Sequence, residues 1–291
     1  MLNESNSVKP VLIVGADGLI GRSLVDILES TRQSVWQTSR QRNGSSKKEF
    51  FLDLSLDSAS WSIPAVAFES AIICSAITSV EQCRIEPEKS AKINVTATLA
   101  LAKYLVSNGV FVVFISSNLV FDGALPYAKS TDLTTPQTNY GQQKAQAEQE
   151  LLKLGNGVAV VRFSKILSPE MKLIKNWIRD LRMGVAIHPF SDMVLSPVSL
   201  RFAASVLQRV AAMKISGITQ ISASQDVSYE AVARYLACKL GVNKNLIEPI
   251  TTENDDYSAP QVNTTLDISR LQNVLLMTPP DVWETIDSLL I

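Results

Sequence analysis

The amino-acid sequence predicts an α/β fold in which a doubly wound parallel sheet is followed by a smaller C-terminal lobe. Three observations support this prediction. Short apolar segments alternate with segments of helical periodicity up to about residue 162, as they do in βαβ units. The first apolar segment leads directly into a glycine-rich turn, and the alternation becomes less regular after residue 162.

The first apolar segment, Val11–Val14, is typical of a buried parallel strand. Gly15, Gly18 and Gly21 follow it with G-x-x-G-x-x-G spacing, and a segment of helical periodicity comes next. Such a turn brings a pyrophosphate to the free N–H groups of a helix N-terminus, which predicts a Rossmann-type dinucleotide site. The alternative is a purely structural turn. The candidate cofactor-binding residues here are Gly15, Asp17, Gly18, Leu19, Ile20 and Gly21.

The end of the second predicted strand, at Ser34–Thr38, indicates which dinucleotide is bound. An NAD site usually has an acidic residue there, which accepts a hydrogen bond from the ribose 2′-hydroxyl. This segment contains Ser39, Arg40 and Arg42, and no Asp or Glu occurs between Glu29 and Glu49. We therefore expect NADP (NADPH), with Ser39 and Arg40 near the 2′-phosphate and NAD as the alternative cofactor. A solvated basic loop would also explain this composition.

The third and fourth predicted strands end in residues that are expected to lie near the same cofactor. Glu49–Leu54 is the third strand, and its end could reach the adenine, although a polar strand end is an equal explanation. Ser70–Ala76 is the fourth, and its small terminal residues would let the backbone lie against a cofactor. The candidate residues are Asp53, Leu54, Ser75 and Ala76.

The alternation continues with a helix and two further strands. A helix is predicted from Pro87 to Val106, because proline suits the first helical turn and apolar residues recur on one side. Val110–Ile115 and Val158–Arg162 are the fifth and sixth strands. Strands and helices at this spacing predict a parallel sheet that is covered by helices on both faces.

A serine, a tyrosine and a lysine are predicted to meet at the carboxyl edge of this sheet, where ligands of open α/β sheets bind. Ser117 leaves the end of the fifth strand, and Tyr140 opens a helix in which Lys144 lies on the same face. We expect Lys144 to lower the pKa of Tyr140, and Tyr140 to exchange a proton with a carbonyl oxygen as hydride moves at the carbon. Ser117 would hydrogen-bond the same oxygen. The alternative is an ordinary helix with a solvent-facing tyrosine and lysine.

The remaining C-terminal part is expected to form mainly a substrate-binding lobe. The dinucleotide-binding domain is predicted to span residues 1–162, with residues of about 198–221 returning to it, and the lobe to span 163–291. Leu200–Ala212 and Tyr229–Leu240 show helical periodicity, and Gly217–Ile221 is typical of a strand.

The composition excludes several classes of function. A formal net charge of -1 gives no basic field for nucleic acid. The three cysteines form no C-x-x-C pair, which is typical of reduced thiols, and no metal site is expected. The start shows no signal-peptide pattern, and no apolar run approaches the roughly 20 residues that span a bilayer. We therefore expect a cytoplasmic protein with no membrane segment.

Several motifs resemble those of the extended short-chain dehydrogenase/reductase family, and within it most of all the dTDP-4-dehydrorhamnose reductases. They are GADGLIG, the block CSAITSVEQCRIEPEKSAKIN, ISSNLVFDG, and YGQQK with Glu148 beyond it. The resemblance implies an NADPH-dependent reduction of a nucleotide sugar, with Ser117, Tyr140 and Lys144 as the catalytic triad. It also implies that Asn94 is the helix asparagine that supports the lysine. A helix-surface or back-bonded asparagine is the open alternative.

The sequence departs from the family pattern at two positions that are associated with sugar and diphosphate recognition. Lys165 follows Arg-Phe-Ser where relatives commonly have an aromatic residue, and Ala259 precedes Pro260 where an arginine is usual. Lys165 would bind an anionic group or be solvated. The candidate substrate-binding residues are Ser117, Asn118 and Lys165.

Two alternative functions share this fold. A sugar-nucleotide epimerase or dehydratase is less favoured, because dehydratases commonly have an acid directly after the triad serine and this chain has Asn118. The other alternative is a non-catalytic, NADP-binding regulatory subunit, similar to that of methionine adenosyltransferase. A homodimer is an arrangement that is common in the wider family.

Overall fold

The computed structural model describes residues 9–41, 47–254 and 261–290, so Arg42, Ala259 and Pro260 lie outside the described residues. The chain divides into two compact units. The first comprises Met1–Ser116, Thr138–Val161 and Ala204–Thr219, and the second comprises Ser117–Gln137, Arg162–Ala203 and Gln220–Ile291. Residues 117–137 thus belong to the second unit although they precede residue 162.

A seven-stranded sheet has the order β10-β6-β5-β4-β1-β2-β3. The pairs β1/β2, β1/β4, β2/β3 and β4/β5 are parallel. The order reverses between β1 and β4, which makes their carboxyl ends the expected ligand-binding position of a doubly wound fold. The strands are β1 (Val11–Val14), β2 (Val35–Ser39), β3 (Glu49–Phe51), β4 (Ser70–Ile73), β5 (Phe111–Ser117), β6 (Val158–Phe163) and β10 (Gly217–Ile221).

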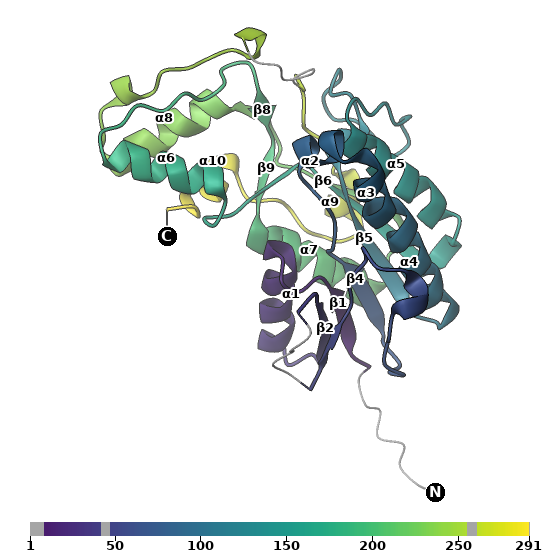
Figure 1. Ribbon diagram of the computed structural model, residues 1–291. Coiled ribbons are helices and arrows are strands. Elements are labelled where there is room, and N and C mark those ends of the chain that lie inside the picture. The colour runs from purple at the N-terminus through teal and green to yellow at the C-terminus, as the bar shows by residue number, and fades with distance from the viewer. Residues whose placement is uncertain (1–8, 42–46, 255–260, 291) are drawn as a thin grey trace, which may run out of the picture. The chain divides into compact units, whose positions relative to one another are not determined.

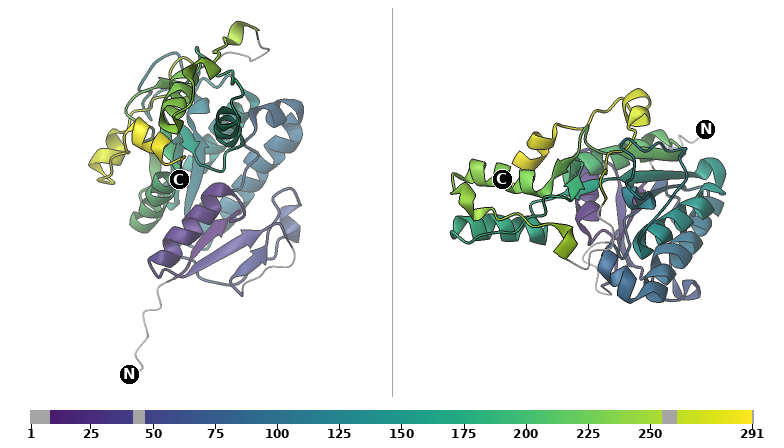
Figure 2. Two further views of the ribbon diagram at one scale, coloured as in Figure 1. Left: turned by 90° about the vertical axis from the view of Figure 1, so that its left-hand side faces the viewer. Right: turned by 90° about the horizontal axis from the view of Figure 1, so that it is seen from above.

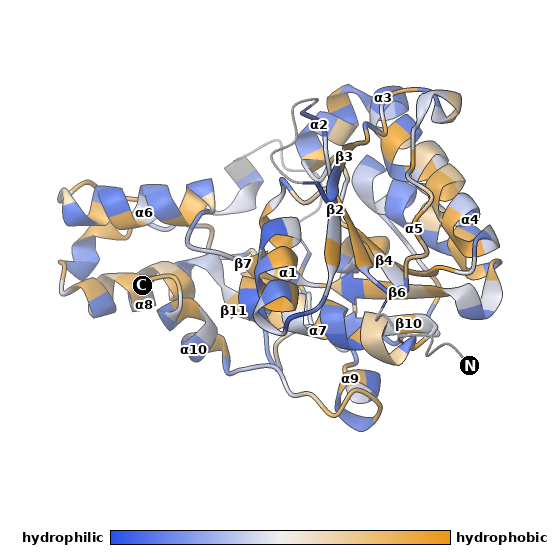
Figure 3. Ribbon diagram, turned by 90° about the horizontal axis from the view of Figure 1, so that it is seen from below, coloured by the Kyte–Doolittle hydropathy of each residue, from blue (hydrophilic) through white to orange (hydrophobic). Residues whose placement is uncertain are grey.

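The central strands are apolar along their whole length because both faces of the sheet are covered. Every residue of β1, β4 and β6 is buried. Such continuous apolar runs are typical of parallel strands between two helical layers. Figure 3 shows β4 and β6 as largely apolar ribbons.

Helices of the first unit form the two layers. In Figure 1 the helices α2, α3, α4 and α5 lie on one side of the sheet, and α1 lies on the other with α7. Gln208 of α7 donates a hydrogen bond to the Thr31 hydroxyl at the end of α1 (3.4 Å). The helices are α1 (Leu19–Ser30), α2 (Val80–Ile85), α3 (Pro87–Ala91), α4 (Thr98–Ser107), α5 (Asn139–Leu152) and α7 (Leu200–Met213).

The long helix that the sequence predicted from Pro87 to Val106 is divided in the structure. Between α3 and α4 the segment η2 (Lys92–Ala97) is π-helical. The Thr98 hydroxyl donates to the Ile93 carbonyl oxygen five residues earlier (2.9 Å), which fits the wider π-helical turn. Single π-helical turns are frequently found at functional sites.

The second unit has its own apolar core, formed by helices and two small sheets. In these sheets β7 pairs with β9 in parallel, and β8 pairs with β11 antiparallel. Trp283 stacks on Tyr235 with ring centroids 4.6 Å apart, and Figure 2 shows the helices of this unit from two further directions. The elements are β7 (Lys165–Leu167), α6 (Lys172–Arg182), β8 (Val194–Leu195), β9 (Pro197–Ser199), β11 (Val227–Ser228), α8 (Tyr229–Leu240), α9 (Ser269–Asn273) and α10 (Val282–Asp287).

Short 3-10 helices connect several of these elements. They are η1 (Ser58–Ser60), η3 (Asn118–Val120), η4 (Gly155–Gly157), η5 (Lys244–Leu246) and η6 (Thr252–Asn254). In the part of the chain that the structure describes, every helix is too short or too polar to cross a membrane.

Candidate active site

The glycine-rich turn forms a cradle at the carboxyl end of β1. Gly18 precedes the first residue of α1, and its N–H donates to the Gly15 carbonyl oxygen (3.2 Å). No side chain caps this end of α1, so the first-turn N–H groups and the positive end of the helix dipole suit an anion. Gly21 is buried, and a Cβ there would lie 2.7 Å from the Ala16 Cα atom. The strand and helix therefore approach as closely as a pyrophosphate cradle requires.

A carboxylate of the glycine-rich turn lies beside the end of β2. Asp17, from the glycine-rich turn, accepts hydrogen bonds from the Ser39 hydroxyl (2.9 Å) and the Arg40 backbone N–H (3.4 Å). Ser39 is buried and Arg40 is exposed. The structure thus brings together three predicted cofactor residues from two segments. The segment between Glu29 and Glu49 contains no acidic residue, so the carboxylate beside the end of β2 comes from the glycine-rich turn.

The predicted residues after β3 and β4 differ in their surroundings. The Asp53 carboxylate accepts from the Ser55 N–H (2.8 Å), and Leu54 is buried. Ser75 lies directly against the glycine-rich turn: its N–H donates to the Val14 carbonyl oxygen (3.1 Å), and a Cβ on Gly15 would be 3.0 Å from its nitrogen. Ala76 follows it. Cofactor binding by these residues stays a prediction.

Tyr140 and Lys144 lie on the buried face of α5. The Thr138 hydroxyl accepts from the Gly141 N–H (3.0 Å), which fixes the first turn of the helix and places Tyr140 within it. Tyr140 is 8% exposed and Lys144 is 3% exposed. The Lys144 ammonium donates to the Ile115 carbonyl oxygen (2.8 Å) and lies 5.8 Å from the centroid of the Tyr140 ring. The alternative of a solvent-facing pair is therefore excluded.

Burial shifts both pKa values away from the charged forms. It raises the pKa of Tyr140, and the neighbouring Cys83 thiol adds to the shift. It lowers the pKa of Lys144 to about 8, a change that the buried Glu148 carboxylate one turn along the helix opposes. The expectation that the pKa of Tyr140 is lowered is wrong, because burial of the phenol raises it. Tyr140 therefore holds its proton at neutral pH.

Asn94, on the π-helical segment, belongs to a buried polar network that ends next to Lys144. Its side-chain amide accepts from the Ile77 N–H (2.8 Å) and donates to the Ile77 carbonyl oxygen (2.9 Å). It also donates to Gln143 Oε1 (2.8 Å), one residue before Lys144. This excludes a surface asparagine. Support of Lys144 itself by Asn94 stays a prediction.

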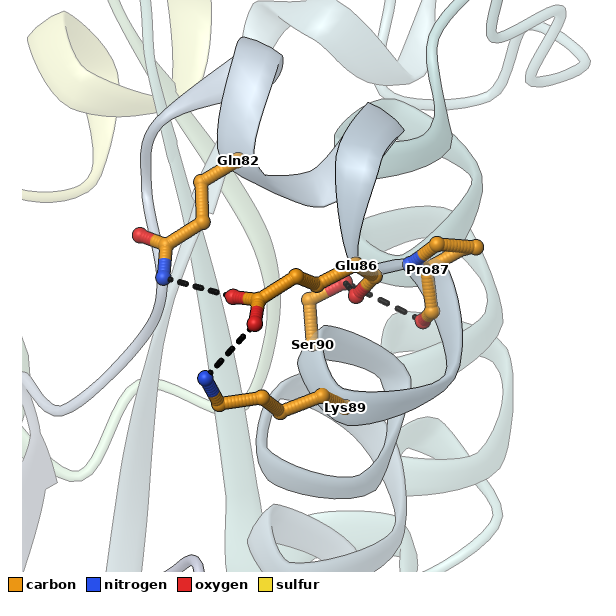
Figure 4. A network of polar contacts seen from close by, with 5 residues as sticks. All are labelled: Gln82, Glu86, Pro87, Lys89 and Ser90. Carbon is orange, nitrogen blue, oxygen red and sulfur yellow. Dashed lines mark hydrogen bonds and ion pairs between the residues drawn. The ribbon is translucent and has the colours of Figure 1, made fainter.

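Gln143 is a residue that the sequence reasoning missed. Its Nε2 donates to the Ser90 hydroxyl (2.8 Å), which in turn donates to the Glu86 carbonyl oxygen (2.8 Å; Figure 4). Gln143 thereby ties α5 to α3. Helical spacing from Tyr140 could have revealed it, because positions three and four residues later share one face.

Ser117 and Asn118 lie in the second unit, where β5 ends and η3 begins. The Ser117 hydroxyl oxygen accepts from the Leu119 N–H (3.2 Å), and the hydroxyl donates to Asn118 Oδ1 (3.4 Å). The convergence of Ser117 with Tyr140 and Lys144 stays a prediction. So does anion binding by Lys165, the exposed first residue of β7. Among the described residues, no group of three or more His, Cys, Asp or Glu side chains could hold a metal ion.

Comparison with known families matches the RmlD substrate binding domain over residues 9–290. This chain belongs to that family. The predicted resemblance to reductases of the extended short-chain dehydrogenase/reductase type is thereby confirmed, and so is the predicted Rossmann-type fold.

Curated relatives of this RmlD-family protein have two kinds of name. Methionine adenosyltransferase 2 subunit beta of Mus musculus is 26% identical over 279 residues, which are 91% of this chain and 82% of the relative. A dTDP-4-dehydrorhamnose reductase of Aggregatibacter actinomycetemcomitans is 28% identical over 296 residues, with 94% and 95% covered.

Solved structures share the fold of this RmlD-family protein. A dTDP-4-dehydrorhamnose reductase from Bacillus anthracis str. Ames, crystallised with NADP, has a TM-score of 0.85 at 20% identity, covering 97% of this chain and 98% of that one. MoeE5 in complex with UDP-glucose and NAD has a TM-score of 0.80 at 22% identity, with 96% of each chain covered.

Proposed function

We propose that this protein is an NADPH-dependent reductase of a keto group on a nucleotide-linked sugar. The observation that carries the proposal is the buried pair on α5, in which a phenol that keeps its proton lies one helical turn from an ammonium. The family supports it, because a relative 28% identical over nearly the whole chain is a dTDP-4-dehydrorhamnose reductase. An epimerase or dehydratase is less favoured, since Asn118 provides no acid beside Ser117.

The first unit fits a dinucleotide. The uncapped first turn of α1 would hold the pyrophosphate through the N–H groups of Leu19, Ile20 and Gly21. Ser39 and the exposed Arg40 would hold the 2′-phosphate, since a guanidinium binds phosphate well. NAD is the alternative cofactor, because the Asp17 carboxylate beside Ser39 could accept a ribose hydroxyl. When bound, the nicotinamide supplies the hydride.

The chain's own residues would manage the proton. Tyr140 keeps its hydroxyl proton until negative charge develops on the keto oxygen, and then donates it. Lys144 stabilises the phenolate that remains, because an opposite charge nearby favours the ionised form. Ser117 donates a hydrogen bond to the same oxygen. The long 3.4 Å bond from its hydroxyl to Asn118 is easily given up for this purpose.

The test is NADPH oxidation, followed by absorbance, with a panel of nucleotide-linked 4-keto sugars. We expect stoichiometric cofactor consumption with at least one member of the panel. Conversion of a sugar with no net consumption of cofactor would instead identify an epimerase. No conversion of any sugar would reject the proposal.

A regulatory role is the second candidate, because the subunit beta of methionine adenosyltransferase from mouse is similar over 91% of this chain. A protein with this role would co-elute with a methionine adenosyltransferase catalytic subunit in size-exclusion chromatography and change its turnover. Co-elution by a protein that consumes no NADPH would favour this candidate over the reductase.

The pKa of Lys144 predicts how dinucleotide binding depends on pH. With a pKa lowered to about 8, the ammonium is present below pH 8 and is lost above it. If the ammonium binds the cofactor, NADPH affinity at pH 9 should be roughly tenfold lower than at pH 7. Fluorescence titration from pH 6.5 to 9.5 measures this. Lys144→Met should bind more weakly with no such dependence, and a flat profile in the wild type would contradict the prediction.

Neutralising Asp17 is expected to strengthen the preference for NADPH. The carboxylate lies against Ser39 and Arg40, so it would repel a 2′-phosphate placed there. Asp17→Asn should raise the NADPH-over-NADH affinity ratio by about fivefold, since like-charge repulsion near the surface costs on the order of 1 kcal/mol. Binding titrations with both dinucleotides measure the ratio. Asp57→Asn, which changes an exposed cap of η1, is the matched control. A lower NADPH-over-NADH affinity ratio in Asp17→Asn would contradict the prediction. It would show that Asp17 helps to place Ser39 and Arg40 for the 2′-phosphate.

A further inference from the structure

The buried side chain of Gln143 joins three elements of the first unit. Its Oε1 accepts from Asn94 Nδ2 on η2 (2.8 Å). Its Nε2 donates to the Ser90 hydroxyl oxygen (2.8 Å) and to the Pro87 carbonyl oxygen (3.3 Å), both on α3. Asn94 and Ser90 are also buried. One amide of α5 is therefore bonded to α3 and to the π-helical segment at the same time.

The other contacts of Asn94 hold the backbone just beyond the end of β4. Asn94 Oδ1 accepts from the Ile77 N–H (2.8 Å), and Nδ2 donates to the Ile77 carbonyl oxygen (2.9 Å). The Cys83 thiol donates to the same carbonyl oxygen (3.5 Å). Ile77 lies four residues after the last residue of β4, so its backbone has left the sheet. Side chains thus hold this segment in place of a neighbouring strand.

The two ends of this network require an amide at position 143. The Pro87 carbonyl oxygen can only accept, so the NH₂ group of Gln143 faces α3 and its oxygen faces Asn94. The Ser90 hydroxyl donates to the carbonyl oxygen four residues earlier (2.8 Å; Figure 4), so it accepts from Gln143. The backbone groups of Ile77 direct one Asn94 proton at their carbonyl oxygen and leave the second for Gln143. An apolar side chain at position 143 would leave that buried proton unpaired, which is unfavourable.

The sheet order places the segment around Ile77 on the nicotinamide side of the predicted dinucleotide site. The adenosine end is predicted at the end of β2, and the pyrophosphate at the turn after β1. β4 pairs with β1 on the side opposite to β2. A dinucleotide that crosses the point where the strand order reverses therefore has its nicotinamide half at the carboxyl ends of β4 and β5. Lys144, the residue after Gln143, donates to the Ile115 carbonyl oxygen of β5.

We propose that Gln143 is a positioning residue that acts on the dinucleotide through Asn94. It anchors the contact between Asn94 and Ile77 to α3 and α5, and so keeps the segment after β4 in the shape that receives the nicotinamide half. The same side chain ties this segment to the helix that carries Tyr140 and Lys144. This inference rests on the proposed dinucleotide-dependent function.

The first experiment compares two ligands of Gln143→Met, in which an apolar side chain of similar length replaces the amide. NADPH has both halves of the dinucleotide, whereas 2′,5′-ADP has the adenosine half alone. We expect NADPH affinity to fall about tenfold, the factor that one unpaired buried polar group costs, and 2′,5′-ADP affinity to stay within about twofold. Gln142→Met, an exposed neighbour on the same helix, should bind both ligands as the wild type does. Equal losses for the two ligands, or unchanged NADPH affinity, would overturn the proposal.

A double-variant comparison tests whether Gln143 acts through Asn94. Asn94→Leu removes the contact with Ile77 and should also weaken NADPH binding by about tenfold. Adding Gln143→Met should then change the affinity by less than about twofold, because the anchor has no remaining contact to hold. Losses that multiply in the double variant would show that Gln143 acts independently of Asn94, and would contradict the proposal.

A final measurement uses the protein without dinucleotide. In Gln143→Met, hydrogen exchange of the Ile77 amide, whose acceptor is Asn94, should be faster by about tenfold or more. The amides of Ile72 and Ile73, within β4, should keep their wild-type rates, which would exclude a general loss of stability. Unchanged exchange at Ile77, or equally faster exchange at all three positions, would overturn the proposal. Selectively faster exchange at Ile77 in a protein that binds no dinucleotide would confirm the anchor and place the failure in the proposed function.

Discussion

Tyr140→Phe is expected to lower keto-sugar reduction by roughly three orders of magnitude, because it removes the proton donor and leaves the rest of the helix in place. The tyrosine is buried on α5, and its raised pKa keeps the phenol protonated at neutral pH. Phenylalanine fills the same space without the hydroxyl. The measurement is kcat/KM for NADPH oxidation with the keto sugar that the wild type reduces.

Two controls separate this chemical effect from a structural one. NADPH affinity and Tm should stay close to those of the wild type in Tyr140→Phe. Tyr104→Phe, which changes a 45% exposed tyrosine on α4, should keep full activity. Retained turnover in Tyr140→Phe would remove Tyr140 from the mechanism.

The central sheet could be predicted from sequence because its strands carry their own signal. Runs such as Val11–Val14 and Phe111–Ile115 are apolar at every position, which is typical of a parallel strand covered on both faces. The glycine spacing after β1 is likewise a local signal, since Gly15, Gly18 and Gly21 all lie in one short segment that directly follows the strand. The helices at Leu200–Met213 and Tyr229–Leu240 also followed from periodicity.

The contacts that the sequence analysis missed join residues of distant segments. Asp17 and Ser39 are 22 residues apart, so the carboxylate beside the end of β2 could not be found by reading along that strand. Gln261 Oε1 accepts a hydrogen bond from Asn118 Nδ2 although 143 residues separate the two in sequence. Neither contact can be predicted from the sequence, because a contact between two single polar side chains produces no periodicity and no change in composition.

The pKa of Tyr140 could not be predicted because the spacing of two side chains does not determine their burial. Tyr140 and Lys144 were correctly placed on one helix face. The sequence does not show that this face is covered, or that the ammonium is bonded to the Ile115 carbonyl oxygen. Desolvation then determines the direction of both pKa shifts.

Gly21→Ala is expected to weaken dinucleotide binding at least tenfold and to lower the free energy of unfolding by about 1–3 kcal/mol, as overpacking does. The added Cβ would lie 2.7 Å from the Ala16 Cα atom and 3.0 Å from the Gly15 carbonyl carbon. Both neighbours are backbone, so α1 must move away from β1. The helix propensity gained from alanine, about 1 kcal/mol, offsets only part of this cost.

Gly18→Ala is the matched control for Gly21→Ala, because the two glycines belong to the same turn but have different surroundings. A Cβ on Gly18 would meet the Gly15 carbonyl oxygen at 3.5 Å, an ordinary contact, and the φ of -77° suits alanine. Gly18→Ala should therefore keep the stability of the wild type while its methyl group obstructs the approach of a pyrophosphate. Denaturant unfolding and NADPH titration of both variants measure the two effects separately. If Gly21→Ala kept full stability, the close contact between α1 and the end of β1 would not determine the shape of the cradle.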